Sequence, residues 1–541
     1  MSSNTVNKEQ SGPILPTLTQ LNVELPKGAV DALAIASQWF THFTHCLETG
    51  DAVGIVDLFL DNAFWRDTLA LTWEFRTFHG LAKILRFLTD VLASSNTNIE
   101  SEIRSNDDRV TLSNVSSDTN QGMFSFETSV RIGSGVFRLV PSEEWKAHVV
   151  YTNLEELKGF PELIGALRST ASNHGDDWLE ERRRELEFAD SEPAVVVIGV
   201  GHCGLEVAAR LKYLGVPTLI TERNSRVGDS WRLRYEALSL HDPIHAAHMP
   251  YLPFPLTWPL WTPAPKIADW LETYAQTLEL NVWTSTAVEK VEEDAVDGQG
   301  PWQVHVIRAS GQKRVLKPNH VVFATGLFGG SPRVPVFPGM VRSPLLIIVL
   351  HTHSERSAEE HEGKKVAIIG ACTSGHDVAH DHGKRGIEGL DLYYVCEERR
   401  NNVQQRDLLE GLKKRGFKLN MGEDGSGVHM LYIYLLFVSG TDTGASQMIV
   451  DGKIKVKNDS AISRFTEDGI EFENGSSLAA DVIILATGYG NAKEHVRTLV
   501  SAEVANRLKP VWALNEDGEI NSVFRYSGVQ GLYFAMVVFK S

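Results

Sequence analysis

The chain begins with a polar stretch and then alternates between helical and strand-like patterns of apolar residues. Residues 1–30 are rich in Ser, Asn, Thr and Pro without periodicity, which predicts a disordered tail and connector. Apolar residues at helical spacing predict helices over 29–60 and 81–92. Helices followed by several antiparallel strands indicate a small α+β domain over 31–155. Aromatic and β-branched stretches predict its strands at 63–65, 69–75, 109–115, 123–131 and 144–152.

A charged helix-forming segment, 156–190, predicts a helical linker to a region with a different pattern. There an apolar run at 194–198 predicts a buried parallel strand, a helix-like stretch follows at 205–214, and a second strand is expected at 217–221. Glycines at the spacing G-x-G-x-x-G follow the first strand, and an acid ends the second. These residues are Gly199, Gly201, Gly204 and Glu222.

The chemistry of this unit follows from the geometry of a dinucleotide-binding βαβ turn. Gly199 allows the tight turn, Gly201 lets the backbone approach a pyrophosphate, and Gly204 permits close packing of the helix on the strand. The helix N-terminus supplies free N–H groups and a partial positive charge. Glu222 is expected to accept hydrogen bonds from a ribose.

A second unit of this kind begins at Lys364 with KKVAIIG. Its middle glycine is replaced by Cys372, whose side chain crowds the closest approach of a pyrophosphate. Two dinucleotide-binding folds imply two dinucleotides, and the economical pair is FAD in the first and a nicotinamide cofactor in the second. The residues predicted to line the second site are Gly370, Thr373, Ser374 and Gly375.

Composition narrows the class of protein further. The formal charge is −17, and no block of like charges is long enough to form an acidic or basic tail, so nucleic acid is an unexpected partner. The four cysteines are far apart in sequence, which favours a reducing compartment. The N-terminus has no apolar core of a signal peptide, and no apolar run approaches the length of a membrane span. We therefore expect a cytoplasmic protein with no membrane span.

The motifs from the first glycine turn onward resemble the class B flavin-dependent monooxygenases, and within them the flavin-containing monooxygenase family in its fungal and YUCCA-like branch. The resemblance spans about residues 190–535. It rests on the first fingerprint and on segments that follow it in the family's order: 222–224 (ERN), 227–231 (VGDSW), 240–243 (LHDP), 249–255 (MPYLPFP), 324–326 (ATG) and 486–489 (ATGY).

The resemblance implies an α/β fold with two Rossmann-like domains, for FAD and NAD(P), behind a small α+β cone-like domain. It implies FAD-binding parts at 191–345 and 471–541, the latter apparently truncated, around an NAD(P)-binding domain at 346–470. The implied reaction uses NADPH to reduce FAD and O2 to form a flavin peroxide that transfers one oxygen atom to a small organic substrate. The implied flavin-side residues are Gly228, Ser230, Trp231, His241, Thr487 and Gly488, with His241 in a catalytic position against flavin or nicotinamide.

Two departures from the family pattern concern the reductant. At the F-x-G-x-x-x-H signature the aligned residues are Leu345, Ile347 and His351, so only the histidine is kept. Glu397 occupies the place of an arginine that pairs with the 2′-phosphate of NADPH, and a carboxylate there repels a phosphate. Arg399 and Arg400 follow closely and favour NADPH over NADH. The alternatives are an NAD(P)H-dependent flavin reductase or oxidase and a catalytically decayed flavin-binding protein.

Three features allow other functions. The N-terminal domain resembles the SnoaL-like cone folds, in which Trp65, Asp67, Trp73 and His79 are conceivable pocket residues; a packing or dimerisation module is the favoured alternative. His376 and His380 share a helix face near His382, a spacing that can bind a metal, but their place beside a dinucleotide predicts no metal site. The tryptophans of 258–270 suggest either a protein-binding platform or a loop beside the flavin.

Overall fold

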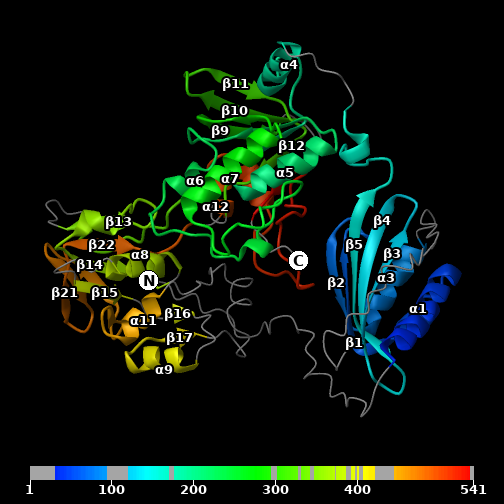
Figure 1. Cartoon of the computed structure of the whole chain (residues 1–541), viewed down its shortest axis with the longest axis horizontal. Coiled ribbons are helices and arrows are strands. Elements are labelled where there is room, and N and C mark those ends of the chain that lie inside the picture. The colour runs from blue at the N-terminus through cyan, green and yellow to red at the C-terminus, as the bar shows by residue number, and fades with distance from the viewer. Residues whose placement is uncertain are drawn as a thin grey trace. The chain divides into compact units, whose positions relative to one another are not determined.

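The computed structural model describes most of the chain as two compact units. Met1–Leu167 and Leu514–Ile520 belong to the first unit, and Arg168–Ala513 and Asn521–Ser541 to the second (Figure 1). The described residues are 31–93, 120–169, 176–293, 301–326, 331–340, 347–371, 373–384, 391–395, 399–400, 406–420, 444–490 and 492–536.

The first unit is an α+β fold in which helices cover a mixed five-stranded sheet of order β2-β1-β5-β4-β3. Strands β1 and β5 are parallel, and the other neighbours are antiparallel. An aromatic-rich core joins the helices to the sheet, with Trp39, Phe43, Trp65 and Phe87 among its buried residues. The elements are α1 (Ala32–Thr49), α2 (Ala52–Asp57), β1 (Phe59–Thr68), β2 (Phe75–His79), α3 (Leu81–Ala93), β3 (Asn120–Glu127), β4 (Arg131–Val140) and β5 (Lys146–Leu157).

Two predictions for this unit are corrected by the structure. The helix expected over 29–60 is divided after Thr49, because Gly50 takes a left-handed φ of 68° and Asp51 caps the next helix. Of the strand expected at 69–75, residues 69–74 form a turn instead, and Phe75 begins β2. The buried carboxylate of Asp67 accepts hydrogen bonds from the backbone N–H groups of Leu71 and Thr72, which bends the chain away from the sheet. The strand expected at 109–115 lies outside the described residues.

The segment Leu514–Ile520 also belongs to the first unit, although it was expected in the second part of the FAD-binding domain. Glu519, which is buried, forms a bidentate ion pair with Arg66, with N···O distances of 2.8 and 3.0 Å. Thr77 donates a hydrogen bond to the same carboxylate at 2.6 Å. Opposite charges far apart in the sequence thus hold this returning segment on β1 and β2.

The second unit contains two parallel sheets, as the sequence predicts. The first has the order β23-β12-β6-β7-β8. Helices α5 and α7 contact each other (Figure 1) and share one hydrophobic core with this sheet. Its elements are β6 (Val195–Ile198), α5 (His202–Tyr213), β7 (Thr218–Thr221), α6 (Asp229–Arg232), α7 (Ala264–Thr277), β8 (Val282–Trp283), β12 (His320–Phe323) and β23 (Leu532–Phe534).

The second parallel sheet has the order β13-β22-β14-β15-β18. Its central pairing joins β14 to β22, which lies beyond the domain boundary expected at residue 470. The NAD(P)-type sheet therefore extends to Leu485. Its elements are β13 (Ile348–His351), η4 (Ala358–His361), β14 (Lys365–Ile369), α8 (Thr373–Lys384), β15 (Asp391–Val395), α9 (Arg406–Lys414), α11 (Ala445–Val450), β18 (Lys455–Lys457) and β22 (Val482–Leu485).

Short elements complete the second unit. Antiparallel three-stranded sheets follow β8 and β18, with orders β11-β10-β9 and β19-β20-β21. No helix in the described ranges combines the length and the apolar character that crossing a membrane requires. The remaining bounds are η2 (Gly165–Leu167), α4 (Asp176–Glu187), η3 (Ile244–Ala246), β9 (Thr286–Glu293), β10 (Trp302–Arg308), β11 (Lys313–Leu316), β16 (Arg399–Arg400), β17 (Leu419–Asn420), β19 (Ile462–Phe465), β20 (Gly469–Phe472), β21 (Ser477–Ala479), α12 (Ala492–Arg497) and α13 (Ala502–Arg507).

Candidate cofactor-binding site

The glycine turn between β6 and α5 contains two glycines that the fold itself requires. Gly199 has a φ of 107°, and a Cβ there would lie 2.5 Å from the carbonyl oxygen of Ala324. At Gly204 a Cβ would lie 2.0 Å from the carbonyl oxygen of Gly199. The first glycine thus makes the turn beside β12, and the last lets α5 pack on it.

Gly201 is different, because nothing in the protein requires a glycine there. It has a φ of −73°, and a Cβ would meet no atom within 4 Å. It is also the N-cap of α5, without a side-chain hydrogen bond to the free N–H groups of the helix. The structure therefore keeps an open space in front of an uncapped helix N-terminus, which suits a pyrophosphate.

Glu222 ends β7 and joins the glycine turn to the following loop. One carboxylate oxygen accepts the Val200 N–H at 3.1 Å, and the other accepts the Asn224 N–H at 2.8 Å. An ionised carboxylate has about four acceptor positions, so these two bonds fix its orientation and leave acceptor capacity for a ribose.

The turn before α6 comes close to the same helix N-terminus. Gly228 has a φ of 89°, and a Cβ there would lie 2.4 Å from the carbonyl oxygen of Ala268. Trp231, which directly follows the exposed Ser230, meets the ring of His202 edge to face, with the ring centroids 5.7 Å apart. Because His202 directly follows Gly201, the structure brings the two predicted flavin-binding turns together.

The second Rossmann unit repeats the geometry of the first. Gly370 has a φ of 105°, and a Cβ there would lie 2.4 Å from the carbonyl oxygen of Ala486, just as Gly199 abuts Ala324. Thr373 and Gly375 are buried at the start of α8, and Ser374 is half-buried. Cys372 lies outside the described residues. The turn and helix of a dinucleotide site are therefore present here as well.

The segment after β22 forms a second crossover. Thr487 donates a hydrogen bond from its hydroxyl to the carbonyl oxygen of Arg333 at 2.5 Å. The carbonyl oxygen of Gly488 accepts the Arg333 N–H at 2.9 Å and faces His351 Nε2 at 2.9 Å. Thr487 and Gly488 thus join β22 to the chain that follows β12.

His351, the histidine kept from the family signature, is buried in a fixed tautomer. Its Nδ1 accepts the backbone N–H of His353 at 3.0 Å, so the ring proton lies on Nε2 and is donated to Gly488. Burial lowers the pKa of His351. This residue therefore orders the crossover as a neutral imidazole.

His241 lies against a carboxylate of the second Rossmann unit. Its Nε2 is 3.0 Å from Oδ2 of Asp377, and the Tyr235 hydroxyl donates to the same oxygen at 2.9 Å. Asp377 belongs to α8 and is almost fully buried. Burial, reinforced by the Asp377 charge, raises the pKa of Tyr235. The sequence pointed to His241 and, separately, to Asp377 beside the histidines of α8. It did not connect the two residues, and it did not indicate Tyr235.

The pKa of His202 is lowered to about 4, because its ring is desolvated beside Trp231. The unfolded chain, with a pKa near 6.5, binds this proton more readily than the folded protein does. The contribution of neutral His202 to the free energy of unfolding is therefore fully present above about pH 6.5. It is lost as the pH falls toward 4, by about 3 kcal/mol in total.

Urea unfolding of the apoprotein between pH 7.5 and 4.5 should show a smaller loss of unfolding free energy in His202→Gln than in the wild type. The exposed His245 supplies the control His245→Gln, which should behave as the wild type; equal slopes in all three proteins would contradict the assignment.

The pocket considered in the N-terminal domain has residues on both faces of the sheet. Trp65 and Asp67 are buried on the core side, where each hydrogen-bonds the Thr152 hydroxyl. His79 stacks on Phe64, whose side chain points to the other face of β1. Trp73 is 66% exposed, beneath the guanidinium of Arg131. The four residues considered, Trp65, Asp67, Trp73 and His79, thus do not converge.

Of the residues expected to set the preference between NADPH and NADH, the structure describes only some. Arg399 and Arg400 form the short strand β16, which pairs with Leu419–Asn420. Glu397 lies outside the described residues. The backbone therefore places the two arginines shortly after β15, at the carboxyl end of a strand of the second parallel sheet, where a Rossmann fold binds its ligand.

Two glycine turns, each at a helix N-terminus beside a parallel sheet, are typical of flavoproteins with two dinucleotide-binding domains. A family model described as pyridine nucleotide-disulphide oxidoreductase matches residues 196–408. Indole-3-pyruvate monooxygenase YUCCA1 of Oryza sativa subsp. japonica is 31% identical over 323 residues, which cover 55% of this chain and 77% of the relative. Probable indole-3-pyruvate monooxygenase YUCCA4 of Arabidopsis thaliana is 30% identical over 329 residues, covering 55% and 75%.

The chain belongs to the YUCCA-like family of flavin-dependent monooxygenases. It is an FAD-dependent enzyme that consumes NADPH and O2, and the open helix N-terminus at Gly201 fits such cofactors. Among solved structures, a flavin-containing monooxygenase from Stenotrophomonas maltophilia is 19% identical, with a TM-score of 0.44; the match covers 63% of this chain and 89% of that one.

Proposed function

We propose that the first Rossmann unit holds FAD, that the second holds NADPH, and that the oxygen atom goes to a small 2-oxo acid with an aromatic side chain. The observation that carries the assignment of FAD is the open space at Gly201, which the fold does not need for itself. When bound, FAD supplies the chemistry that activates O2. The candidate substrate is indole-3-pyruvate, because the relatives named above are monooxygenases of that compound.

Residues of this chain bind and orient the cofactors in this proposal. Gly199, Gly201, Gly204 and Glu222 hold FAD, with Gly228, Ser230 and Trp231 in the adjoining turn. Gly370, Thr373, Ser374 and Gly375 hold NADPH. His241, oriented by Asp377 of the second Rossmann unit, contacts flavin or nicotinamide.

The proposal is tested by NADPH oxidation with indole-3-pyruvate, with amines and sulfides as the competing substrate classes. Substrate-dependent NADPH consumption, with one atom of ¹⁸O₂ in the product by mass spectrometry, is the expected result. NADPH consumption that yields only hydrogen peroxide, whichever substrate is added, would identify a flavin oxidase instead. Flavin binding without any NADPH consumption would identify a flavin-binding protein without turnover.

Arg399 and Arg400 are proposed to pair with the 2′-phosphate of NADPH. Replacing both by alanine should raise KM for NADPH by roughly tenfold to a hundredfold, since a charge-assisted hydrogen bond contributes about 1.5–3 kcal/mol. KM for NADH, which lacks the phosphate, should change little. The exposed pair Lys413 and Lys414, on α9 of the same domain, provides a control with the same loss of charge. Equal changes for both cofactors in Arg399→Ala/Arg400→Ala would show that these arginines do not contact the phosphate.

The N-terminal unit is proposed to be a SnoaL-like domain that serves packing or dimerisation. The aromatic core and the spread of Trp65, Asp67, Trp73 and His79 over both faces of the sheet support this role over a ligand pocket. A cytoplasmic location is proposed on the cysteine pattern of the sequence.

A further inference from the structure

We infer that Glu355, His361 and His382 form a binding site for a divalent transition-metal ion of the zinc class. The three residues are buried in the second Rossmann unit, and one ligand atom from each lies within 4.8 Å of the others. None of them belongs to the glycine turns or to the proposed cofactor contacts. The inference therefore does not depend on the proposed substrate or on the cofactor assignments.

Three separate segments bring these side chains together. Glu355 lies in the loop after β13, His361 ends η4, and His382 lies near the end of α8. Nε2 of His361 is 3.1 Å from Oε2 of Glu355, and Nε2 of His382 is 3.9 Å from Oε1. The two imidazole rings are nearly parallel, 16° apart, with centroids at 5.7 Å. Each carboxylate oxygen therefore faces one imidazole nitrogen.

The tautomer of His382 determines which of its ring nitrogens can bind a cation. Nδ1 of His382 lies 2.8 Å from the carbonyl oxygen of Val378, which can only accept, so Nδ1 carries the ring proton. Nε2 then presents a lone pair toward Oε1 of Glu355, another acceptor. Both atoms are buried without a hydrogen-bond partner. Two buried acceptors that face each other require a positive species between them.

A metal ion fits this gap better than a proton does. At 3.9 Å the two atoms are too far apart for a hydrogen bond. Two donors about 2.1 Å from a tetrahedral ion are roughly 3.4 Å apart, so only a small adjustment is needed. The hydrogen bond from His382 Nδ1 to a backbone carbonyl is also the outer contact that orients metal-binding histidines.

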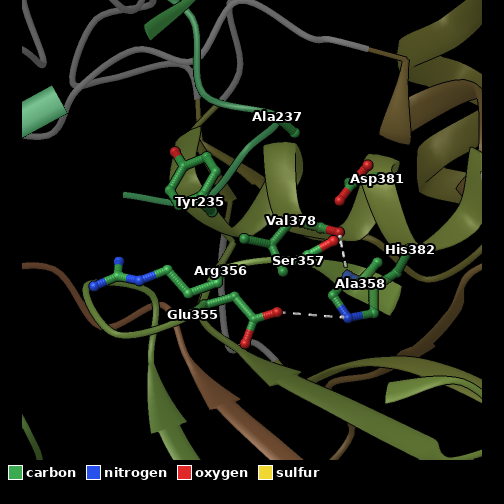
Figure 2. Close-up of a pocket in the computed structure, with 9 residues that line it drawn as sticks. All are labelled: Tyr235, Ala237, Glu355, Arg356, Ser357, Ala358, Val378, Asp381 and His382. Atoms are coloured by element: carbon green, nitrogen blue, oxygen red, sulfur yellow. Dashed lines mark hydrogen bonds and ion pairs between the residues drawn. The ribbon is translucent and has the colours of Figure 1, made fainter. Parts of the chain in front are cut away.

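The donor set selects the class of ion. Two imidazole nitrogens and one carboxylate suit zinc and neighbouring transition metals, whereas Ca²⁺ and Mg²⁺ prefer sites of oxygen ligands. Figure 2 shows Glu355 and His382 facing each other across the pocket, with Asp381 on its lining. The ion would fasten the loop after β13 to α8, and so stabilise the proposed NADPH-binding domain.

The sequence did not reveal this site. It drew attention to His376, His380 and His382 on one helix, and it predicted no metal. The cluster includes only His382 of that group and adds two ligands from the segment between β13 and β14. The spacing of histidines along one helix cannot identify further ligands that lie in another segment of the chain.

The test is metal binding by the purified full-length enzyme without an affinity tag. After dialysis against a chelator, we expect about one equivalent of Zn²⁺ or Co²⁺ to rebind, with cobalt giving the visible absorption of a low-symmetry site, and the melting temperature to rise. Glu355→Gln and His382→Gln should each weaken binding at least tenfold. Glu362→Gln and His380→Gln are the matched controls, since Glu362 is exposed and His380 lies on the same helix outside the cluster; both should bind as the wild type does.

Several outcomes would overturn the inference. Failure to take up a stoichiometric ion, or a melting temperature that metal does not change, would mean that Glu355 and His361 only share a proton. Undiminished binding in Glu355→Gln and His382→Gln would place the ion elsewhere. FAD content and circular dichroism check folding, and His361→Gln replaces any variant that fails to fold. Loss of NADPH-dependent turnover with full metal binding would count against the proposed function and leave the metal site standing.

Discussion

Gly201→Val should weaken FAD binding strongly while leaving the protein folded. The added side chain would enter the open space in front of α5, where a pyrophosphate must approach the backbone. Overpacking of a tight contact costs about 1–3 kcal/mol, so Kd for FAD should rise roughly tenfold to a hundredfold. The unfolding free energy of the apoprotein should fall by no more than about 1 kcal/mol, the usual cost of an unfavourable N-cap. Flavin absorption of the purified protein and fluorescence titration with FAD measure the effect.

Gly199→Val is the contrasting variant. A side chain at Gly199 clashes with Ala324 and requires a left-handed backbone, so this substitution should impair folding itself. Gly201→Ala, with a smaller side chain, should lie between the wild type and Gly201→Val in FAD affinity. Retention of full flavin by Gly201→Val would mean that FAD does not bind at this turn.

The sequence predicted these turns because their determinants are local. Strand, glycines, helix and acid follow one another within about thirty residues, and each glycine has a physical task that spacing alone identifies. The structure separates these tasks: Gly199 and Gly204 serve the fold, and Gly201 leaves room for a ligand. The parallel sheets were predictable for the same reason, since short apolar runs bounded by glycines are typical of buried strands.

Features that depend on distant partners were not predictable. The turn after β1 exists because one carboxylate, Asp67, binds the following backbone, which overrides the strand-like pattern of residues 69–75. Leu514–Ile520 joins the first unit because Glu519 meets Arg66, a pairing of residues far apart in the chain. The second sheet reaches past residue 470 because β22 pairs with β14. Periodicity describes one element at a time and contains no information on such pairings.

The contact between His241 and Asp377 leads to the second large effect, expected in Asp377→Ala. The buried carboxylate accepts from both Tyr235 and His241, and its removal leaves two donors without their acceptor. An unsatisfied buried polar group costs about 1–3 kcal/mol, which is the expected loss in unfolding free energy. Because a misplaced group beside the reacting atoms can cost about a hundredfold in rate, we expect flavin reduction by NADPH to slow roughly tenfold to a hundredfold. Anaerobic stopped-flow absorption of the flavin measures this rate.

Three controls separate positioning of His241 from general damage in Asp377→Ala. FAD content and the rate of flavin reduction by dithionite should be unchanged, because neither depends on NADPH. Tyr235→Phe removes one hydrogen bond but keeps the contact between Asp377 and His241, so it should retain most of the rate. If His241 acts through its orientation by Asp377, the double variant His241→Ala/Asp377→Ala should be no slower than the slower single variant. Independent, multiplying losses in the double variant, or a destabilised Asp377→Ala that still reduces flavin at the wild-type rate, would restrict Asp377 to a packing role.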